Sequence, residues 1–284
     1  MTPSYTHIEG LYGSEYFDEG SGPVIVFLHG IGSSFDSFSR QIEHLSGSFR
    51  VISWGLPGYG MSAALDCEQP ELPDYVDRLQ QFVDWLALDS FHLVGHSLGA
   101  LIGAGFAARC PERLLSLSLC SVPQGFGAMP KEVQQERFID RIYSLCALGP
   151  AGMAERRGPR LVTPNADPEV VSRIVATMSK VRYDGYAHAS HMLARADVRP
   201  FAEQIPDWLP VLLYVGSEDH ITPPSDSEVV LGCLKHAVFE ILPGAGHAIY
   251  LERPLEFSAC IQKFVEKLGR TRPLIAGQRE CSVD

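Results

Sequence analysis

The sequence FHLVGHSLG, residues 91–99, decides the fold that we predict for this chain. It opens with a short apolar run typical of a buried strand, and Leu98 to Cys110, rich in glycine and alanine, is typical of a helix that stops at Pro111. The glycines at both ends of the Gly-x-Ser-x-Gly pattern let the backbone turn sharply, so that Ser97 projects above the sheet. A hydroxyl held there, at the positive end of a helix dipole, is placed as a nucleophile. A tight turn with a capping serine is the alternative.

Short apolar runs elsewhere in the chain predict further strands of the same sheet. Runs that are apolar on both faces are typical of parallel strands covered by helices on both sides. Helical patterns alternate with them, which predicts an α/β fold with a mostly parallel, doubly wound sheet. A hairpin turned at Gly13, with arms at 5–12 and 14–19, is expected to lead into it. Strands are predicted at residues 24–28, 49–53, 91–94, 114–120, 211–215 and 237–242, and helices at 75–86, 98–110 and 254–268.

The strand signal is absent between Val122 and Pro206. Helical patterns at 131–148, 168–183 and 186–195 occupy most of this stretch. We predict a helical cap inserted between two strands of one sheet, and the alternative is a pair of ordinary crossover helices with a long loop. The α/β core would then consist of residues 1–121 and 207–284, and the cap of residues 122–206.

Two loops that follow predicted strands carry the partners that a serine nucleophile needs. Asp219 follows the strand at 211–215, and His247 follows the last strand in a glycine-rich loop. Because sites in open α/β sheets lie at the carboxyl ends of the strands, we predict Ser97 as nucleophile, His247 as general base and Asp219 as the orienting carboxylate. The alternatives are a solvated loop histidine and a turn aspartate that bonds its own backbone. Glu218, next to Asp219, is expected to face elsewhere.

The loop after the strand at 24–28, His29-Gly30-Ile31-Gly32, supplies a fourth element. A tetrahedral oxyanion needs two preorganised N–H donors. The amide of Leu98, which follows the nucleophile, is one candidate for this oxyanion hole, and the amide of Ile31 is the other. We expect His29 to be a structural hydrogen-bonding residue rather than a catalyst.

Together these motifs resemble the α/β-hydrolase superfamily over nearly the whole chain, with residues 122–206 in the position of the family's variable cap. Within the superfamily, the pattern is similar to 3-oxoadipate enol-lactonases and to hydrolases of ring-fission products. Epoxide hydrolases and haloalkane dehalogenases carry aspartate at the elbow, so Ser97 argues against both. Leu56–Ser62 looks like the family's D-x-x-G-x-G-x-S turn with the leading Asp replaced by Trp54 or Gly55, Gly216–Asp219 with Pro223 looks like G-x-x-D-x-x-x-P, and Gly246-His247 with Glu252 and Pro254 looks like G-H-x-x-x-x-E-x-P.

Residues near the nucleophile and in the predicted cap are candidates for substrate binding. Glu155 to Arg160 holds three arginines, and arginine suits bidentate binding of a carboxylate, so a small anionic ester or lactone is a candidate substrate. The alternative for the arginines is a solvated helix end, and the alternative for the apolar candidates is a place in the packed core. His188 and His191 stand three apart on a predicted helix without a nearby third ligand, so we predict no metal site. The candidates for substrate binding are Gly30, His96, Phe126, Met129, Met153, Arg156, Arg157, Tyr186 and Met192.

The composition of the 284-residue chain bounds its partners. Apolar residues make up 45% and charged residues 20%, as in soluble globular enzymes. The formal net charge of −11 disfavours nucleic acids and anionic membranes, but it does not exclude an anionic small molecule. Seven cysteines without a C-x-x-C pair, no apolar leader in Met1–Gly10 and no apolar run near ~20 residues predict a cytoplasmic protein without a membrane span. No cofactor is expected, and a homo-oligomer stays open.

Three functions therefore compete. The first is an esterase or lactonase that forms an acyl-enzyme on Ser97. The second is a C–C bond hydrolase of aromatic ring-fission products that uses the same triad. The third is a ligand receptor on a hydrolase scaffold, against which the complete set of Ser97, Asp219 and His247 speaks.

Overall fold

The computed structural model describes residues 5–7 and 13–271 of the chain. Within these ranges one eight-stranded sheet has the order β1-β2-β4-β3-β5-β6-β7-β8. β2 pairs antiparallel with β1 and β4, and every other pair is parallel, which confirms the predicted α/β class with a mostly parallel sheet. The strands are β1 (Tyr5–His7), β2 (Glu15–Glu19), β3 (Val24–Leu28), β4 (Arg50–Trp54), β5 (Phe91–His96), β6 (Leu114–Cys120), β7 (Val211–Gly216) and β8 (Val238–Leu242).

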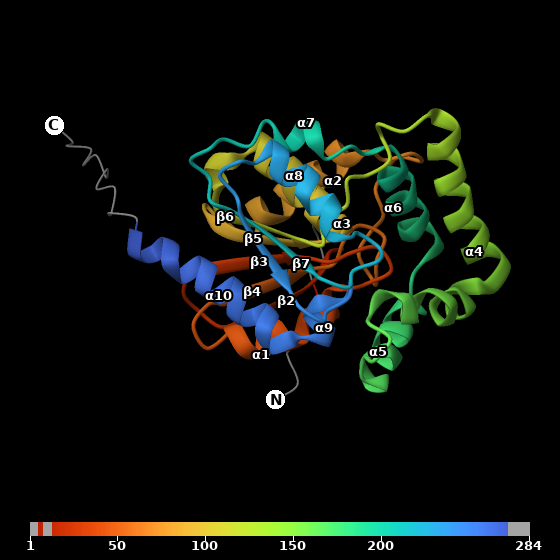
Figure 1. Ribbon diagram of the computed structural model, residues 1–284, viewed down its shortest axis with the longest axis horizontal. Helices are drawn as coiled ribbons and strands as arrows, with labels where there is room; N and C mark the ends of the chain where they lie inside the picture. Colours follow the sequence, from red (N-terminus) through yellow and green to blue (C-terminus); the bar gives the residue numbers. More distant parts are fainter. Residues whose placement is uncertain (1–4, 8–12, 272–284) are drawn as a thin grey trace.

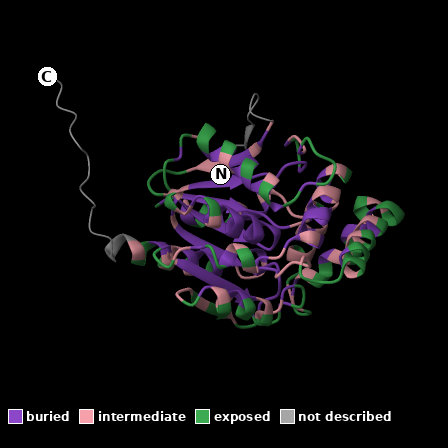
Figure 2. Ribbon diagram, turned by 90° about the horizontal axis from the view of Figure 1, so that it is seen from above, coloured by how far each residue is buried: buried purple, intermediate pink, exposed green. Residues whose placement is uncertain are grey.

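The strands predicted from apolar runs lie within two residues of their expected bounds. The expected leading hairpin corresponds to the antiparallel pair β1 and β2, although residues 8–12 lie outside the described residues. β5 and β7 are buried along their whole length because helices cover both faces of the sheet. β8 lies at the edge of the sheet, and its residues are exposed or half-buried. Figure 2 shows the buried strands between helices whose outer turns are exposed.

Helices cover the two faces of the sheet, as a doubly wound arrangement requires (Figure 1). α2 and α3 contact each other on one face, on which α8 also lies, and α1 and α10 contact each other on the opposite face. α3 begins directly after Ser97, as predicted, and is buried over nearly all of its length. The bounds are α1 (Ser39–Leu45), α2 (Leu72–Trp85), α3 (Leu98–Arg109), α8 (Pro224–Cys233), α9 (Ile249–Glu252) and α10 (Pro254–Thr271).

The chain between β6 and β7 is mainly helical, and its long helices stand to one side of the sheet (Figure 1). The first one continues beyond the expected end at residue 148, because Gly149, at φ 65, turns the backbone and Pro150 then opens a further helical stretch. The expected break at residues 184–185 is wrong, since the helices are interrupted at 179–182 instead. The bounds are α4 (Lys131–Arg157), α5 (Pro168–Met178), α6 (Tyr183–Arg195) and α7 (Arg199–Ala202). The domain limits at 121 and 207 stay a prediction.

Gly185 lies in the first turn of α6 because this helix packs closely against the loop after β4. A Cβ atom on Gly185 would lie 2.1 Å from the carbonyl oxygen of Gly58, and one on Gly58 would lie 2.4 Å from the Cα atom of Gly185. Gly58 also has a φ of 80°, which disfavours any other residue. Two glycines therefore set the distance between α6 and the core.

In the described part of the chain, no helix is both long enough and apolar enough to cross a membrane.

Candidate active site

Ser97 occupies the turn between β5 and α3 with φ 53 and ψ −117, a conformation that is strained for a residue with a side chain. The neighbouring glycines make this turn sterically feasible. A Cβ atom on Gly95 would lie 2.3 Å from the carbonyl oxygen of Gly99, and one on Gly99 would lie 2.2 Å from that of Leu28. The Gly-x-Ser-x-Gly pattern thus lets α3 pack directly against β5 and β3, with Ser97 at the apex.

His247 and Asp219 form a buried hydrogen bond between the loops that follow β8 and β7. Nδ1 of His247 lies 2.9 Å from Oδ2 of Asp219, and both side chains are almost fully buried. Oδ1 of Asp219 accepts hydrogen bonds from the amides of Ile221 and Thr222, each at 2.9 Å. Burial by itself would raise the pKa of Asp219, but His247 and these hydrogen bonds outweigh it and hold the pKa well below its ordinary value. Asp219 is therefore a carboxylate that accepts from the imidazole.

Thr222 is a member of this site that the sequence did not suggest. Its hydroxyl lies 3.0 Å from Oδ2 of Asp219, 3.1 Å from Nδ1 of His247 and 3.0 Å from the carbonyl oxygen of Ser121. The hydroxyl carries one proton, which it donates to the carbonyl of Ser121 or to the carboxylate. The spacing Asp-x-x-Thr, in which the threonine amide also bonds the aspartate, is the signal that would have identified it.

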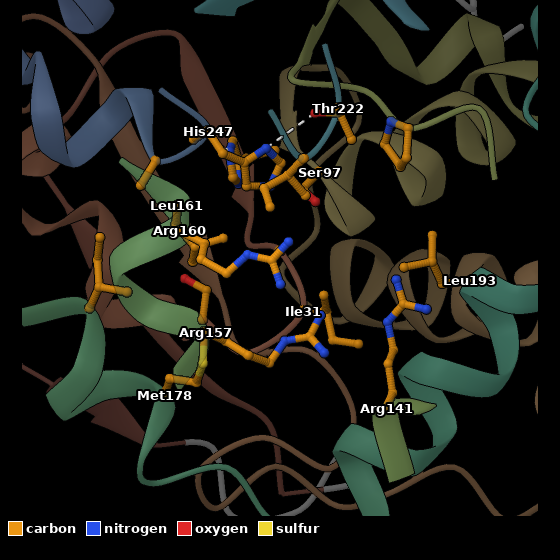
Figure 3. Close-up of a pocket in the computed structure, with 18 of the residues that line it drawn as sticks. Ile31, Ser97, Arg141, Arg157, Arg160, Leu161, Met178, Leu193, Thr222 and His247 are labelled. Atoms are coloured by element: carbon orange, nitrogen blue, oxygen red, sulfur yellow. Dashed lines mark hydrogen bonds between the residues drawn. The ribbon is translucent and has the colours of Figure 1, made fainter. Parts of the chain in front are cut away.

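Ser97 and His247 line the same cavity, and Figure 3 draws them at one end of it. Among the described residues, none forms a hydrogen bond with the Ser97 hydroxyl, so no other described group competes for this hydroxyl. Hydrogen bonds between a nucleophile and its base are often long or poorly aligned without substrate, and they tighten when the substrate binds. Glu218, the rival carboxylate, is exposed, as expected.

Two further buried histidines form hydrogen bonds with backbone atoms close to the site. Nε2 of His96 donates to the carbonyl oxygen of His247 at 2.8 Å, and burial lowers the pKa of His96 to about 3, so the ring is neutral. His29 donates from Nδ1 to the carbonyl of Gly30 at 2.9 Å and accepts at Nε2 from the amide of Leu56 at 3.1 Å. Both nitrogens of His29 are thus used in the structural role expected of it.

The residues predicted to supply the oxyanion hole belong to segments next to Ser97. A Cβ atom on Gly30 would lie 3.1 Å from Cβ of Ser97, so the loop after β3 passes directly over the serine. Ile31 lines the cavity, and the amide of Leu98 is the first in α3, where no carbonyl of the same helix can accept from it. This arrangement is compatible with an oxyanion hole, whose assignment to Ile31 and Leu98 stays a prediction.

Glu252 links the His247 loop to the segment after α4. Its Oε2 atom accepts from the amide of Gly246 at 2.8 Å. Its Oε1 atom accepts from the amide of Thr163 at 3.0 Å and also from the Thr163 hydroxyl. The glutamate of the quoted G-H-x-x-x-x-E-x-P pattern therefore holds the His247 loop against the helical region.

The cavity has a volume of about 270 Å³ and lies between the carboxyl ends of the strands and the helices that follow β6. This volume is just below the usual size range of small-molecule sites. Its wall includes the predicted residues Gly30, His96, Phe126, Met129, Arg157 and Tyr186, and Arg160 of the arginine-rich segment at 155–160. It also includes Arg141, Leu161, Met178 and Leu193, which the sequence did not suggest.

Three of the candidate binding residues lie outside this wall. Met153 and Met192 are fully buried in the packing of the core, where their side chains contact protein instead of a ligand. Arg156 is exposed, because it precedes Arg157 by one residue on α4 and so points about 100° away from it. Over the ranges that the structure describes, no group of three His, Cys, Asp or Glu side chains is arranged to hold a metal ion.

The comparison with known families decides the classification. A family model described as the alpha/beta hydrolase fold matches residues 23–254. The chain belongs to this family. Among known proteins, this α/β hydrolase is similar to 3-oxoadipate enol-lactonase 2 of Acinetobacter baylyi, with 24% identity over 260 residues that cover 89% of this chain and 92% of the relative. It is also similar to the (E)-2-((N-methylformamido)methylene)succinate hydrolase of that organism, with 26% identity over 261 residues that cover 89% of this chain and 94% of the relative.

Solved structures agree with this classification. A thermophilic esterase from Thermogutta terrifontis, described as malate bound, matches this α/β hydrolase with a TM-score of 0.82 and 25% identity over 94% of this chain and 99% of the esterase. The enol-lactonase from Burkholderia xenovorans matches with a TM-score of 0.82 and 24% identity over 93% of this chain and 100% of the lactonase, a likeness that bears on the fold alone. Family and relatives make this chain a hydrolytic enzyme, so the ligand-receptor alternative is not supported.

Proposed function

We propose that this α/β hydrolase cleaves a small carboxylic ester or lactone through an acyl-enzyme on Ser97, with His247 as general base and Asp219 as the orienting carboxylate. The observation that carries this proposal is the 2.9 Å hydrogen bond between Nδ1 of His247 and Oδ2 of Asp219, next to a cavity that Ser97 also lines. The buried carboxylate fixes the proton on Nδ1, which leaves Nε2 with a lone pair for proton abstraction.

The reaction proceeds in two halves. Nε2 of His247 takes the proton from Ser97 as Oγ forms a bond to the carbonyl carbon, and the amides of Ile31 and Leu98 hold the resulting oxyanion. The bond from that carbon to the leaving oxygen then breaks, and His247 returns its proton to this oxygen, which in a lactone stays tethered to the acyl chain. Water, deprotonated by His247, attacks the acyl-enzyme and releases the acid and Ser97. Each oxyanion donor contributes about 3 kcal/mol to the transition state.

Two of the names support ester or lactone chemistry. One relative is named as an enol-lactonase, and a similar solved structure is described as an esterase. The other relative is named as a hydrolase of a formamido-substituted methylenesuccinate, and this name contains no ester or lactone. The C–C bond hydrolase uses the same residues, and no contact in the cavity favours it over ester cleavage.

The test compares the wild-type protein with Ser97→Ala. The wild type is expected to hydrolyse p-nitrophenyl butyrate and to bind a fluorophosphonate probe covalently at Ser97, as read by mass spectrometry of the peptide. Ser97→Ala should keep its circular dichroism spectrum and lose about 10³-fold or more in kcat/KM. Full activity of this variant would end the proposal, and cleavage of a dienoic ring-fission product without cleavage of esters would assign C–C chemistry instead.

A further inference from the structure

Guanidinium groups of three arginines line the cavity next to Ser97. Arg141 lies in the first part of α4, Arg157 lies at its end, and Arg160 follows in the short 3-10 helix Gly158–Leu161. The turn at Gly149 lets both parts of α4 face the same space. Figure 3 shows Arg157 and Arg160 entering from one wall and Arg141 entering from the opposite wall.

These arginines differ from the surface arginines in their ion pairing. In the described part of the protein, Arg141, Arg157 and Arg160 form no ion pair, whereas Arg109 and Arg113 on the surface pair with aspartates at 2.6 and 2.7 Å. The Nε atom of Arg141 is buried without any hydrogen-bond partner, and Nη1 reaches only the carbonyl oxygen of Arg137, at 3.3 Å. A buried charged donor without an acceptor is costly, so an acceptor from outside the chain is the natural partner.

The local charge of the cavity is positive in a chain whose formal net charge is −11. Burial, reinforced by the neighbouring charge of Arg157, lowers the pKa of Arg141 to about 10, which leaves the group cationic at neutral pH. Asp226 is the one carboxylate among the described residues of the wall, and Gln124 donates a hydrogen bond to it at 2.8 Å. Burial raises the pKa of Asp226, and its carboxylate offsets at most one of the three guanidinium charges.

We propose that this arginine cluster, Arg141, Arg157 and Arg160, binds a free carboxylate that the substrate carries in addition to the bond cleaved at Ser97. The substrate class is a half ester of a short dicarboxylic acid, or a lactone that bears a carboxylate. The planar guanidinium fork matches a carboxylate with two parallel hydrogen bonds. The cavity of about 270 Å³ restricts the substrate to a short chain, and Ile31 and Leu193 offer apolar contact to its methylene groups. The cleavage step rests on the proposed function, whereas binding of the carboxylate does not.

The first experiment measures charge selectivity. The substrate is the p-nitrophenyl half ester of glutaric acid, and its control is the same molecule with the free acid converted to a methyl ester. Wild-type kcat/KM is expected to be at least about tenfold higher for the anionic substrate. In Arg157→Gln and in Arg141→Gln, the ratio of anionic to neutral kcat/KM should fall about 10- to 100-fold.

Arg156→Gln is the matched control, because Arg156 is adjacent to Arg157 and exposed outside the cavity. It should keep the wild-type ratio. Equal turnover of the two wild-type substrates, or an equal loss of selectivity in Arg156→Gln and Arg157→Gln, would overturn the inference. Thermal unfolding of each variant identifies any protein that has failed to fold, in which case Arg160→Gln replaces it.

The second experiment measures binding without turnover. Titration calorimetry with Ser97→Ala protein should detect binding of glutarate and succinate, and weaker binding of butyrate. When Arg157→Gln is added to Ser97→Ala, the affinity for glutarate should fall about tenfold or more. If inorganic phosphate binds more tightly than glutarate, the arginine cluster is a phosphate site and the proposal of a carboxylate ligand is overturned. Ester cleavage without charge preference would refute this inference and leave the proposed function intact. Glutarate binding that depends on Arg157, in a protein that cleaves no ester, would support this inference and refute the proposed function.

Discussion

The hydroxyl of Thr222 lies 3.1 Å from Nδ1 of His247, at the side of the ring that faces the carboxylate of Asp219. Thr222 thus touches both members of the proposed charge pair while its hydroxyl remains within 3.0 Å of the carbonyl of Ser121. Because the hydroxyl contacts no reacting atom, Thr222 is a positioning residue that keeps the imidazole and the carboxylate in register.

Replacement of Thr222 by valine should lower kcat about three- to tenfold and leave KM nearly unchanged, since one buried hydrogen bond is lost while the amide that bonds Asp219 remains. Thr222→Ser should restore most of kcat, because serine provides the same hydroxyl. The measurement is steady-state kinetics on a p-nitrophenyl ester. Equal kcat in the wild type and the valine variant would remove Thr222 from the mechanism.

Two substitutions that replace a carboxylate with an uncharged amide should distinguish the roles of Asp219 and Glu218. Asp219→Asn places an amide N–H donor against His247 Nδ1, which favours the tautomer protonated on Nε2, so kcat should fall about 10³- to 10⁴-fold. Glu218→Gln, at an exposed position, should stay within about twofold of the wild type. A larger loss in Glu218→Gln than in Asp219→Asn would show that the wrong carboxylate has been assigned.

The sequence predicted the sheet and the loops that carry Ser97, Asp219 and His247, and the reason is local. Each of these residues lies in the loop or turn that follows a short apolar run, and the runs correspond to β5, β7 and β8. Since parallel strands all end at the same edge of a sheet, three positions far apart in the chain could be placed together without knowledge of their contacts.

The walls of the cavity depend instead on how the helices after β6 pack. Arg141 lies in the wall of the cavity, whereas Arg137, four residues earlier on the same face of α4, does not. Both guanidinium groups lie near the Phe126 ring, at 5.8 and 5.4 Å from its centroid, so no periodicity in the sequence distinguishes them. Met153 and Met192 have the apolar character of pocket residues, but they face the packed core. Which side of a helix meets a ligand is a tertiary property, so it could not be predicted from the residue types.

The stability of the protein should fall as the pH drops from about 6.5 toward 4. Burial lowers the pKa of His92 and of His29 to about 4, from an ordinary value of 6.5, so the unfolded chain binds protons in this window that the folded protein excludes. His92 lies in β5, and its Nδ1 is 2.8 Å from the hydroxyl of Ser116. In His92→Asn, the dependence of the unfolding free energy on pH should flatten by about 1.4 kcal/mol per pH unit, the value for one proton.

Urea unfolding at several pH values between about 4.5 and 6 measures this slope, with the wild-type protein in the same buffers as the reference. An unchanged slope in His92→Asn would mean that this histidine takes up protons equally in the folded and the unfolded chain, which would contradict its lowered pKa.

The close approach of Gly185 to Gly58 should make alanine costly at position 185. A Cβ atom there would lie 2.1 Å from a backbone oxygen, which no side-chain adjustment relieves, so α6 must move away from the loop after β4. α6 carries Tyr186 and Leu193 in the wall of the cavity, so its displacement should raise KM as well as lower the unfolding free energy by about 1–3 kcal/mol.

Gly232→Ala is the matched control for this substitution. Gly232 is exposed in α8, and a Cβ atom there would meet nothing within 4 Å beyond the backbone of its own helix. Alanine should therefore stabilise the helix by about 0.5–1 kcal/mol and leave KM unchanged. Urea unfolding and steady-state kinetics on both variants measure the contrast. If Gly185→Ala were as stable as the wild type with an unaltered KM, the distance between α6 and the core would be free to adjust, and the two glycines would not set the width of the cavity.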